Sequence, residues 1–487
     1  MGIVLRQSLR NTISTYLGFG IGAINALFLY TNFLTDEYYG LVAYILSAAN
    51  IMMPLMAFGV HNTIVKFYSS FKSKNALNSF LTLMLFLPLL IAIPVASIGY
   101  VAYDTIADLL SKENTIVRAY LWYIFITAIS MAYFEVFFAW VKVQMKTVFG
   151  NFMKEVFHRV GAMLLLFSVY FKLISVDTFL IGIVAVYALR AFIMMLYAFA
   201  KWLPVFRFKR IDKLKSIINY ALLIIIAGSV ATLILDIDKF MLNNYLPIET
   251  IAYYSVAVFI ATVIAVPQRA MHQILLPLTA KFLNDDNRIE LKDLYQRSSL
   301  TLFIVSGLIF LLIVLNINEL YKIIPEEFSG GLIVVFLISF AKLYDNLLGN
   351  NNAILFNSDY YRAVLVFGVG LAIMAIVLNM VLIPRLGING SALATFIAIA
   401  VYNTVKIIYV HAKFKMLPFT IATLKTLCLL IVFVLIFYFW DFTFHPIVNI
   451  LLKSVLIGLA YLLLVLRLRL SEDISSSVNA FFSKSSE

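Results

Sequence analysis

Basic side chains recur inside the long apolar segments of this sequence, where they could hold a negatively charged ligand. The candidates are Arg190, Lys239, Arg269 and Lys342. A charge at the centre of a bilayer costs roughly 2.5–3.5 kcal/mol on insertion scales, so such a side chain normally faces a bundle interior, a partner or water. We therefore expect these cations to bind an anion at a membrane-embedded site, with Arg269 as the first candidate.

Acidic side chains in the same segments could carry a coupling ion, either H⁺ or Na⁺. Glu135 has no partner within its own segment, so it could pair with Arg190 or Arg269, or exchange a proton. Asp236 and Asp345 each lie three residues from a lysine, a spacing that lets the two side chains meet on one helix face. For these two lysine–aspartate pairs, mutual neutralisation and ion binding both remain open.

Neutral polar groups complete the set of candidates. Asn25 and Asn32 form a stripe on the first apolar segment, and His61 and His272 lie in two later segments that each contain a proline. Such groups either satisfy one another inside a bundle or line a cavity. The basic residues nearer segment ends are expected to extend to the membrane surface instead; they are Lys406, Lys425 and Lys453.

Catalytic and cofactor signals are lacking in the sequence. The five histidines have no metal-ligand spacing, the single Cys428 has no partner, and no nucleophile or nucleotide-binding motif is present. We therefore expect a protein that is not an enzyme and that uses neither a metal nor an organic cofactor.

The elements that carry these residues must be membrane helices. The chain is 63% hydrophobic and 13% charged, with a mean hydropathy of +0.97. A soluble domain cannot hide that much apolar surface. The net charge of +12 does not indicate nucleic-acid binding, because the basic residues fall in short loops between apolar segments rather than on one soluble face.

About fourteen segments reach the length of roughly 20 residues that a membrane helix needs. Kinks or breaks are expected near Pro54 and Pro267. The predicted spans are 9–34, 40–66, 77–103, 115–141, 147–171, 176–200, 215–244, 251–281, 294–317, 329–357, 361–384, 388–412, 418–440 and 446–468.

The distribution of Lys and Arg predicts the orientation of these spans. With the N-terminus in the cytoplasm, most basic residues fall in or beside cytoplasmic loops, as the positive-inside rule requires. Few fall outside: Lys112, Arg118, Lys172, Lys322 and Arg385. Both termini are then cytoplasmic. Every loop is short, which argues against a membrane glycosyltransferase, polymerase or ligase, since these enzymes usually need a substantial loop for catalysis.

The basic link at 201–215 divides the chain into two similar halves. Aligning Leu34 with Leu246 superposes Asn32 on Asn244 and Glu37 on Glu249. The fold predicted is an all-α bundle in which two lobes of six helices surround a central cavity, followed by two extra helices. The expected divisions are an N-lobe at 1–200, the linker at 201–215, a C-lobe at 216–415, the extra helices at 416–470 and a cytoplasmic tail at 471–487.

A short stretch, VLNMVLIPRLGINGSALAT at 377–395, interrupts two apolar segments. Pro384 cannot donate a backbone hydrogen bond, and Gly387 and Gly390 permit turn geometry. Small residues that follow, such as Ser391 and Ala392, allow close helix packing. The stretch predicts a tight hairpin with a structural role.

This stretch resembles the corresponding turn of Wzx-type polysaccharide biosynthesis flippases, in the multidrug/oligosaccharidyl-lipid/polysaccharide exporter superfamily. The resemblance rests on Asn379, Leu382, Ile383, Pro384, Gly387 and Gly390, and on the opening DEYYGLVAY of the second span. It implies a multi-pass protein of the bacterial cytoplasmic (inner) membrane. The substrate implied is a polyprenyl-pyrophosphate-linked oligosaccharide for surface polysaccharide such as O-antigen (lipopolysaccharide), capsule or exopolysaccharide.

The resemblance also implies partners and a mechanism. Interior cations would hold the sugar-pyrophosphate head while the two lobes rock, the polyprenyl tail would stay among membrane lipids, and the two extra helices could form a groove for it. A polysaccharide polymerase or other assembly protein is an expected partner. Two alternatives come from the same superfamily: a lipid II flippase, which differs in head group, and a cation-coupled multidrug exporter, which would favour an acidic cavity.

Overall fold

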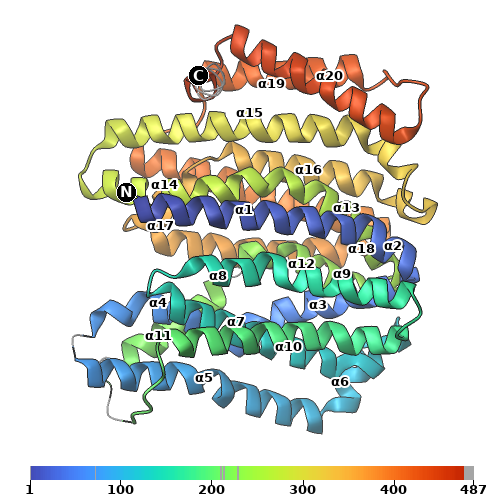
Figure 1. The fold of residues 1–487 in the computed structure, drawn as a ribbon. Coiled ribbons are helices and arrows are strands. Elements are labelled where there is room, and N and C mark those ends of the chain that lie inside the picture. The colour runs from blue at the N-terminus through green and yellow to red at the C-terminus, as the bar shows by residue number, and fades with distance from the viewer. Residues whose placement is uncertain (1, 72, 209–210, 212–213, 228–229, 477–487) are drawn as a thin grey trace. The chain divides into compact units, whose positions relative to one another are not determined.

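The computed structural model describes residues 2–71, 73–208, 211, 214–227 and 230–476, and all the regular structure in these ranges is helical (Figure 1). Ten helical runs among the described residues are long and apolar enough to cross a membrane, and three shorter apolar helices accompany them. The prediction of an all-α, multi-pass membrane protein is therefore confirmed. Each of the fourteen predicted segments is helical over most of its length.

The chain divides into two compact units. Unit 1 comprises Met1–Ser255 together with Asn379–Ile388, and unit 2 comprises Val256–Leu378 together with Asn389–Glu487. Each unit has hydrophobic clusters of its own.

Unit 1 is built around α7 (Leu121–Lys142), which packs against α3 (Asp36–Ala57), α4 (Val60–Phe67) and α10 (Val176–Lys201). Its buried core includes Phe80, Phe134 and Trp140. The remaining helices of this unit are α1 (Gly2–Ile24), α2 (Tyr30–Phe33), α5 (Lys74–Val101), α6 (Tyr103–Leu110), α8 (Thr147–Phe152), α9 (His158–Tyr170), α11 (Leu214–Ala227), α12 (Val230–Leu242) and the start of α13 (Glu249–Thr262).

The second predicted segment breaks into α3 and α4 just after Pro54. Thr35 begins α3 by accepting a hydrogen bond from the backbone of Tyr38, and acidic residues fill the first turn. The helix ends where Phe58 and Gly59 both adopt left-handed backbone angles, with φ of 47° and 62°. The break expected near this proline is confirmed, four residues downstream.

Two π-helical segments widen unit 1 helices at polar positions. One, η1 (Asn25–Leu29), continues α1, and the other, η4 (Met153–Phe157), joins α8 to α9. The two contact each other's helices, because η4 packs against α1 and η1 packs against α9. Such π segments occur frequently at functional sites.

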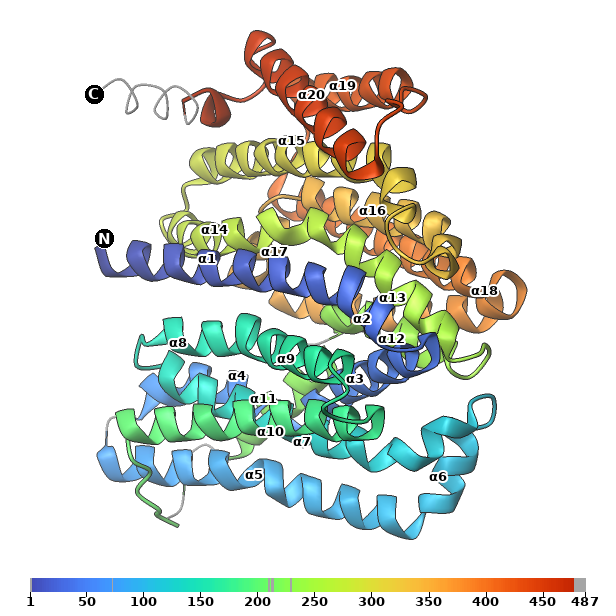
Figure 2. The same cartoon turned by 45° about the vertical axis from the view of Figure 1, so that its right-hand side comes forward.

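Unit 2 centres on the long α15 (Arg288–Tyr321). Figure 2 shows α19 (Ile421–Phe437) and α20 (Pro446–Arg467) beside it, and the three share a buried cluster that includes Phe303, Leu430 and Tyr461. The hydroxyl of Tyr461 donates to the backbone oxygen of Ile304 at 3.2 Å. The other helices are the end of α13, α14 (Val266–Asn284), α16 (Leu332–Leu347), α17 (Asn351–Asn357) and α18 (Tyr361–Phe414), except that Asn379–Ile388 of α18 belong to unit 1.

Pro267 produces the second expected irregularity. It lies in the first turn of α14, directly after the 3₁₀ turn η5 (Val263–Ala265). A proline lacks the amide proton and its ring clashes with the carbonyl four residues earlier, here that of Val263. The chain therefore changes helical geometry at that carbonyl.

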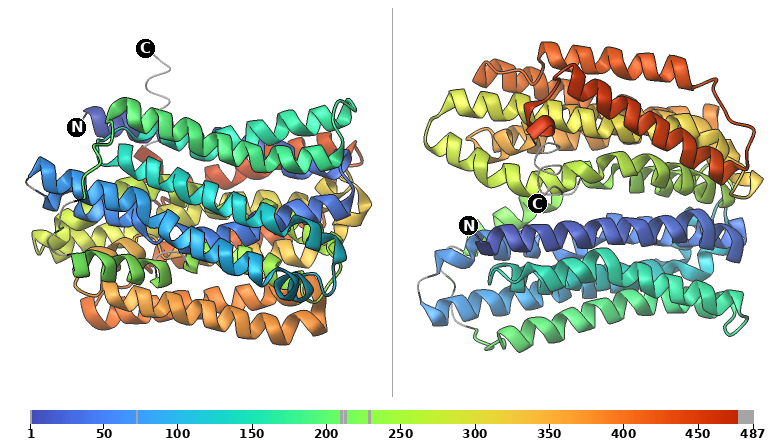
Figure 3. Two further views of the ribbon diagram at one scale, coloured as in Figure 1. Left: turned by 90° about the horizontal axis from the view of Figure 1, so that it is seen from below. Right: turned by 45° about the horizontal axis from the view of Figure 1, so that its top comes forward.

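The 54-residue helix α18 is a hairpin of two arms. Gly387 interrupts it with φ 59° and ψ −137°, a conformation open to glycine. Phe367 and Tyr409 lie on opposite arms, and their ring centroids are 5.2 Å apart. In a straight helix these two residues would be roughly 60 Å apart. Figure 3 shows the two orange arms side by side. The predicted hairpin is confirmed, although the turn is at Gly387, and Pro384 remains helical.

Replacement of Gly59 by alanine should destabilise the protein by roughly 1–2 kcal/mol, the cost of a left-handed non-glycine residue. An added Cβ would also lie 2.6 Å from the backbone oxygen of Ala221. The measurement is thermal unfolding in detergent. Gly99→Ala is the matched control: it lies inside α5 with open space around it, and should leave stability unchanged or slightly higher. Equal melting temperatures for both variants would contradict the packing at Gly59.

Candidate functional site

Arg190 is the most deeply buried of the predicted unit 1 cations. It lies on α10 with 6% of its surface exposed. Its guanidinium carbon is 4.3 Å from the ring centroid of Phe134 and 4.8 Å from that of Tyr187. One terminal nitrogen lies 3.5 Å from Nδ1 of His158, while Nε has no hydrogen-bond partner among the described residues. Aromatic faces thus stabilise the charge, while one buried donor has no partner among the described residues.

Glu135 on α7 has a basic partner that the sequence analysis did not consider. Its Oε1 accepts a hydrogen bond of 2.6 Å from Nζ of Lys154 in η4. His61 and Arg190 also lie within electrostatic reach of the carboxylate. This lysine lies 19 residues further along the chain, so Glu135 is paired across helices rather than within its own segment.

The segment around η4 supplies the functional groups that the sequence reasoning missed. Lys154, Glu155, His158 and Arg159 follow one another within the predicted span 147–171. Arg159 pairs with Glu155 at 3.4 Å, and both lie within electrostatic reach of Arg190. The signal was present in the sequence, since such a charged run deep in an apolar segment is costly unless it lines a polar interior.

Together these side chains form a polar cluster inside unit 1, which we call the Arg190 cluster. Its cations outnumber its carboxylates, because four basic residues surround two acidic ones. Its members are Lys142, Lys154, Arg159, Arg190, Glu135, Glu155, His61, His158 and Tyr187.

Asp236, Lys239 and Asn243 recur at helical spacing along α12 and the turn after it, and this polar stripe separates into two environments. Asp236 accepts side-chain hydrogen bonds from Ser47 and Asn50 of α3, and Lys239 acts on it electrostatically. Asn243 instead is fully buried and donates to the backbone oxygen of Leu110 at 2.8 Å. The stripe therefore does not present one continuous polar face.

Asp238, between these residues, connects α12 to the hairpin motif. It is fully buried and accepts hydrogen bonds from the Tyr254 hydroxyl and, at 2.8 Å, from Nδ2 of Asn379. Asn379 is the first residue of the motif that carries the family resemblance. Its amide is used for packing within unit 1, in agreement with the structural role expected for this stretch.

Asn25 and Asn32 differ in environment, although both were expected on one stripe. Asn25 is buried in η1 and donates to the backbone oxygen of Arg159 at 2.8 Å, so it joins the first helical run to α9, which carries Arg159 and His158 of the Arg190 cluster. Asn32 is exposed and donates to Phe28 of its own helix at 2.7 Å. Of the two, Asn25 contacts the cluster and Asn32 is satisfied locally.

Unit 2 has a second polar cluster, centred on Asp345 of α16. Its Oδ1 accepts a hydrogen bond of 3.3 Å from Asn403. His272 and Lys406 lie within electrostatic reach. Gln268, the neighbour of Arg269, donates to the backbone oxygen of Asp345 at 3.5 Å.

The two remaining predicted cations lie on helices of this second cluster. Arg269 on α14 is exposed, and Lys342 on α16 is partly buried. Both make interactions of their own. A pair between Lys342 and Asp345 stays a prediction.

Lys406 contradicts the expectation that it extends to the membrane surface. It is 1% exposed, donates to Oδ1 of Asn352 at 3.1 Å, and lies 4.2 Å from the ring centroid of Tyr402. Lys453 is likewise buried and pairs with Asp441 at 2.7 Å. Only Lys425 is exposed as expected. Position along a helix did not reveal that neighbouring helices cover the other two side chains.

Comparisons with known proteins place this geometry in a family. A family model described as "Polysaccharide biosynthesis protein" matches residues 4–283. The chain belongs to this family. The family recognised from the hairpin motif is therefore confirmed. No curated protein sequence matches the chain at a significant level.

Solved structures show which fold the family member adopts. The lipid II flippase MurJ in an inward closed conformation is similar over 94% of this chain and 98% of its own, with a TM-score of 0.69 and 14% identity. An inward-facing multidrug resistance MATE transporter is similar over 88% and 96%, with a TM-score of 0.57 and 14% identity.

A third structure comes from Pyrococcus furiosus and is described as a MOP superfamily transporter with reversed polarity of its binding pocket. It is similar over 86% of this chain and 96% of its own, with a TM-score of 0.58 and 13% identity. At such identities the likeness shows the fold. The chain is thus a polysaccharide biosynthesis family member with the fold of these transporter structures.

Lys406→Ala should destabilise the protein by roughly 2–3 kcal/mol, because it removes a buried side chain and leaves its polar partners unsatisfied. Lys425→Ala is the matched control and should change stability by less than about 0.5 kcal/mol, since Lys425 is exposed. Both are measured by denaturant unfolding in detergent. A similar loss of unfolding free energy in the two variants would contradict the burial of Lys406 and favour a side chain at the membrane surface.

Proposed function

We propose that this protein is a flippase that moves polyprenyl-pyrophosphate-linked oligosaccharides across the bacterial cytoplasmic membrane for surface polysaccharide assembly. The observation that carries the proposal is the Arg190 cluster. It is a net cationic group of side chains around the buried Arg190, inside a member of the polysaccharide biosynthesis family. A pyrophosphate head needs such compensating charge to enter a membrane protein.

Arg190 is the proposed anchor for the pyrophosphate. The rings of Phe134 and Tyr187 lie against its guanidinium, so they restrict the side chain before the ligand arrives. Its unpartnered Nε supports a contact with an anionic oxygen. Lys154 and Arg159 lie on the same polar run and would share the remaining phosphate charge.

Further binding residues are proposed on both units. Lys239, Asn25, His61 and Asn32 are candidates in unit 1, and Arg269, Lys342 and His272 are candidates in unit 2. Asp236 and Asp345 remain candidates for a coupling ion, H⁺ or Na⁺. The cycle proposed is alternating access, in which the head group is exposed first to the cytoplasm and then to the outside.

The tail of the lipid carrier needs an apolar path. A groove with about 830 Å³ of open space lies between α15, α16 and α19. Its lining is aromatic and aliphatic, and includes Phe303, Phe340 and Phe419. We propose that the polyprenyl chain occupies this groove. The extra helices then contribute α19, from Thr423 to Leu427, and Phe419 lines the groove from the segment just before that helix.

A lipid II flippase is the second candidate, favoured by the fold shared with MurJ at a TM-score of 0.69. It would use the same cationic cluster, because lipid II also carries a pyrophosphate. The two proposals differ in the sugar that accumulates when transport fails. A polysaccharide polymerase remains a proposed partner only for the first.

Arg190→Ala should abolish glycan export in a deletion strain while the protein still reaches the membrane. Arg190→Lys should restore little, since a lysine cannot reproduce the planar contacts with Phe134 and Tyr187. Lys425→Ala, an exposed site, is the control and should export normally. The measurement is lipid-linked glycan on the cytoplasmic leaflet. Normal export by Arg190→Ala would refute the site, and accumulation of lipid II would favour the second candidate.

Glu135→Gln tests whether the carboxylate in the Arg190 cluster couples transport to protons. The variant keeps the shape of the side chain but cannot ionise, so transport should lose its dependence on external pH. Export is compared with that of the unmodified protein in vesicles across a range of pH. Transport by the variant that matches the unmodified protein at every pH would exclude Glu135 from coupling.

A further inference from the structure

A pocket lined by basic residues lies where α15 begins and where the chain leaves α18. It is formed within unit 2 by residues that belong to neither polar cluster. It contains about 790 Å³ of open space. Arg288, Lys292 and Gln296 line it from α15, and Phe414, Lys415 and Met416 line it from the end of α18.

The walls of this pocket are fixed by hydrogen bonds and by packing. Nε2 of Gln296 donates to the backbone oxygen of Leu417 at 3.3 Å, which ties α15 to the segment after α18. Oδ1 of Asn287 caps α15 by accepting from the backbone of Glu290 at 3.2 Å. Met416 and Phe414 are buried in a hydrophobic cluster beneath the pocket. The pocket is thus preformed.

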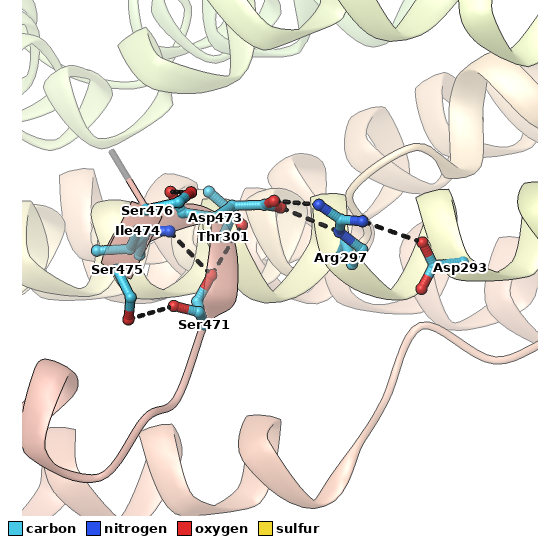
Figure 4. Close-up of polar contacts among 8 residues, drawn as sticks. All are labelled: Asp293, Arg297, Thr301, Ser471, Asp473, Ile474, Ser475 and Ser476. Carbon is cyan, nitrogen blue, oxygen red and sulfur yellow. Dashed lines mark hydrogen bonds and ion pairs between the residues drawn. The ribbon is translucent and has the colours of Figure 1, made fainter. Parts of the chain in front are cut away.

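The carboxylates of Asp293 and Asp473 near this pocket do not neutralise its lysines, because they are bonded to Arg297. Asp293, the acidic residue of the lining, is engaged by Arg297 at 3.4 Å. Figure 4 shows Arg297 between Asp293 and Asp473 of the C-terminal turn, with both carboxylates bonded to it. No described residue forms an ion pair with the side chain of Lys292 or Lys415.

The C-terminal turn at 472–476 holds this arrangement in place. Ser471 accepts from the backbone of Ile474 at 3.4 Å and lies 3.5 Å from the Thr301 hydroxyl of α15 (Figure 4). Leu470 is buried against the core shared by α15, α19 and α20. The turn therefore keeps Asp473 on Arg297 and away from the pocket cations.

An exposed aliphatic side chain borders the same cations. Ile289 lines the pocket next to Arg288, and 83% of its surface is exposed. This position is at the polar end of a helix that is long and apolar enough to cross a membrane, and such ends are expected in the head-group region. Cations beside an exposed aliphatic group match an amphiphile, whose phosphate needs charge and whose acyl region needs apolar contact. A free phosphate ion would gain nothing from Ile289.

We propose that this pocket binds the head group of an anionic membrane phospholipid. Arg288, Lys292 and Lys415 contact the phosphate, and Ile289 contacts the boundary between glycerol and acyl chain. Arg288 also bonds Asp286 at 3.3 Å, and this contact orients its guanidinium. The bound lipid is a partner of the transporter in its membrane. It is distinct from the substrate, and the proposal does not depend on which glycan is moved.

The test compares two triple variants of the full chain that lose the same charge. One carries Arg288→Gln, Lys292→Gln and Lys415→Gln, and the other carries Lys74→Gln, Lys146→Gln and Lys281→Gln at exposed sites outside the pocket. Purified proteins in detergent are titrated with phosphatidylglycerol or phosphatidylcholine, and bound lipid is counted by native mass spectrometry. The pocket variant should bind phosphatidylglycerol at least about tenfold more weakly, and the control should match the unmodified protein.

Two further arms separate the contributions to binding. Ile289→Asn should weaken phosphatidylglycerol binding without a change of charge, and phosphatidylcholine should not respond to any variant. Equal loss in both triple variants would show unspecific attraction to basic residues and overturn the proposal. Displacement of the lipid by millimolar inorganic phosphate, or no effect of Ile289→Asn, would show an ion site instead of a lipid site and would overturn it as well.

Discussion

Hydrocarbon offers no hydrogen-bond partner, and this constraint governs every polar position in the protein. A buried charge must be met by an opposite charge, a dipole or an aromatic face, or its burial costs more than the fold can supply. Arg190 shows how the requirement is met without an adjacent carboxylate. Two aromatic faces and a histidine surround its guanidinium, and the nearest acidic groups act from a distance. Such partial compensation leaves a cation able to accept an anionic ligand.

The two polar clusters meet this constraint in different ways. In unit 1 the cations exceed the carboxylates, and the π-helical segment η4 and the start of α9 place Lys154 and Arg159 on one short run of backbone. In unit 2 the charges are compensated largely by side-chain amides. Asn403 donates a hydrogen bond to Asp345, and Asn352 accepts one from Lys406. The first arrangement suits recognition of a charged head group. The second satisfies its own members, so we assign it a larger structural contribution.

The membrane surface imposes a different requirement from the interior. Cations there are solvated and can stay unpaired at little cost, which is why basic residues collect at one side of membrane proteins. The pocket at the start of α15 combines this freedom with fixed walls. Arg297 draws the neighbouring carboxylates to itself, so Lys292 and Lys415 keep their charge for a ligand. The interior and surface sites proposed for this chain would recognise two different anionic lipids.

The sequence by itself determined that the chain is a membrane protein, where its apolar helices run, where they break, and that residues 377–395 form a hairpin. These features depend on local composition, on proline and glycine, and on the length a bilayer requires. The tertiary structure alone decided which polar groups meet. The ion pair of Glu135 with Lys154, the burial of Lys406 and the contact between Asp238 and Asn379 all join residues from different helices. Periodicity shows which face of a helix is polar, but the helix opposite that face is chosen by packing across the whole unit.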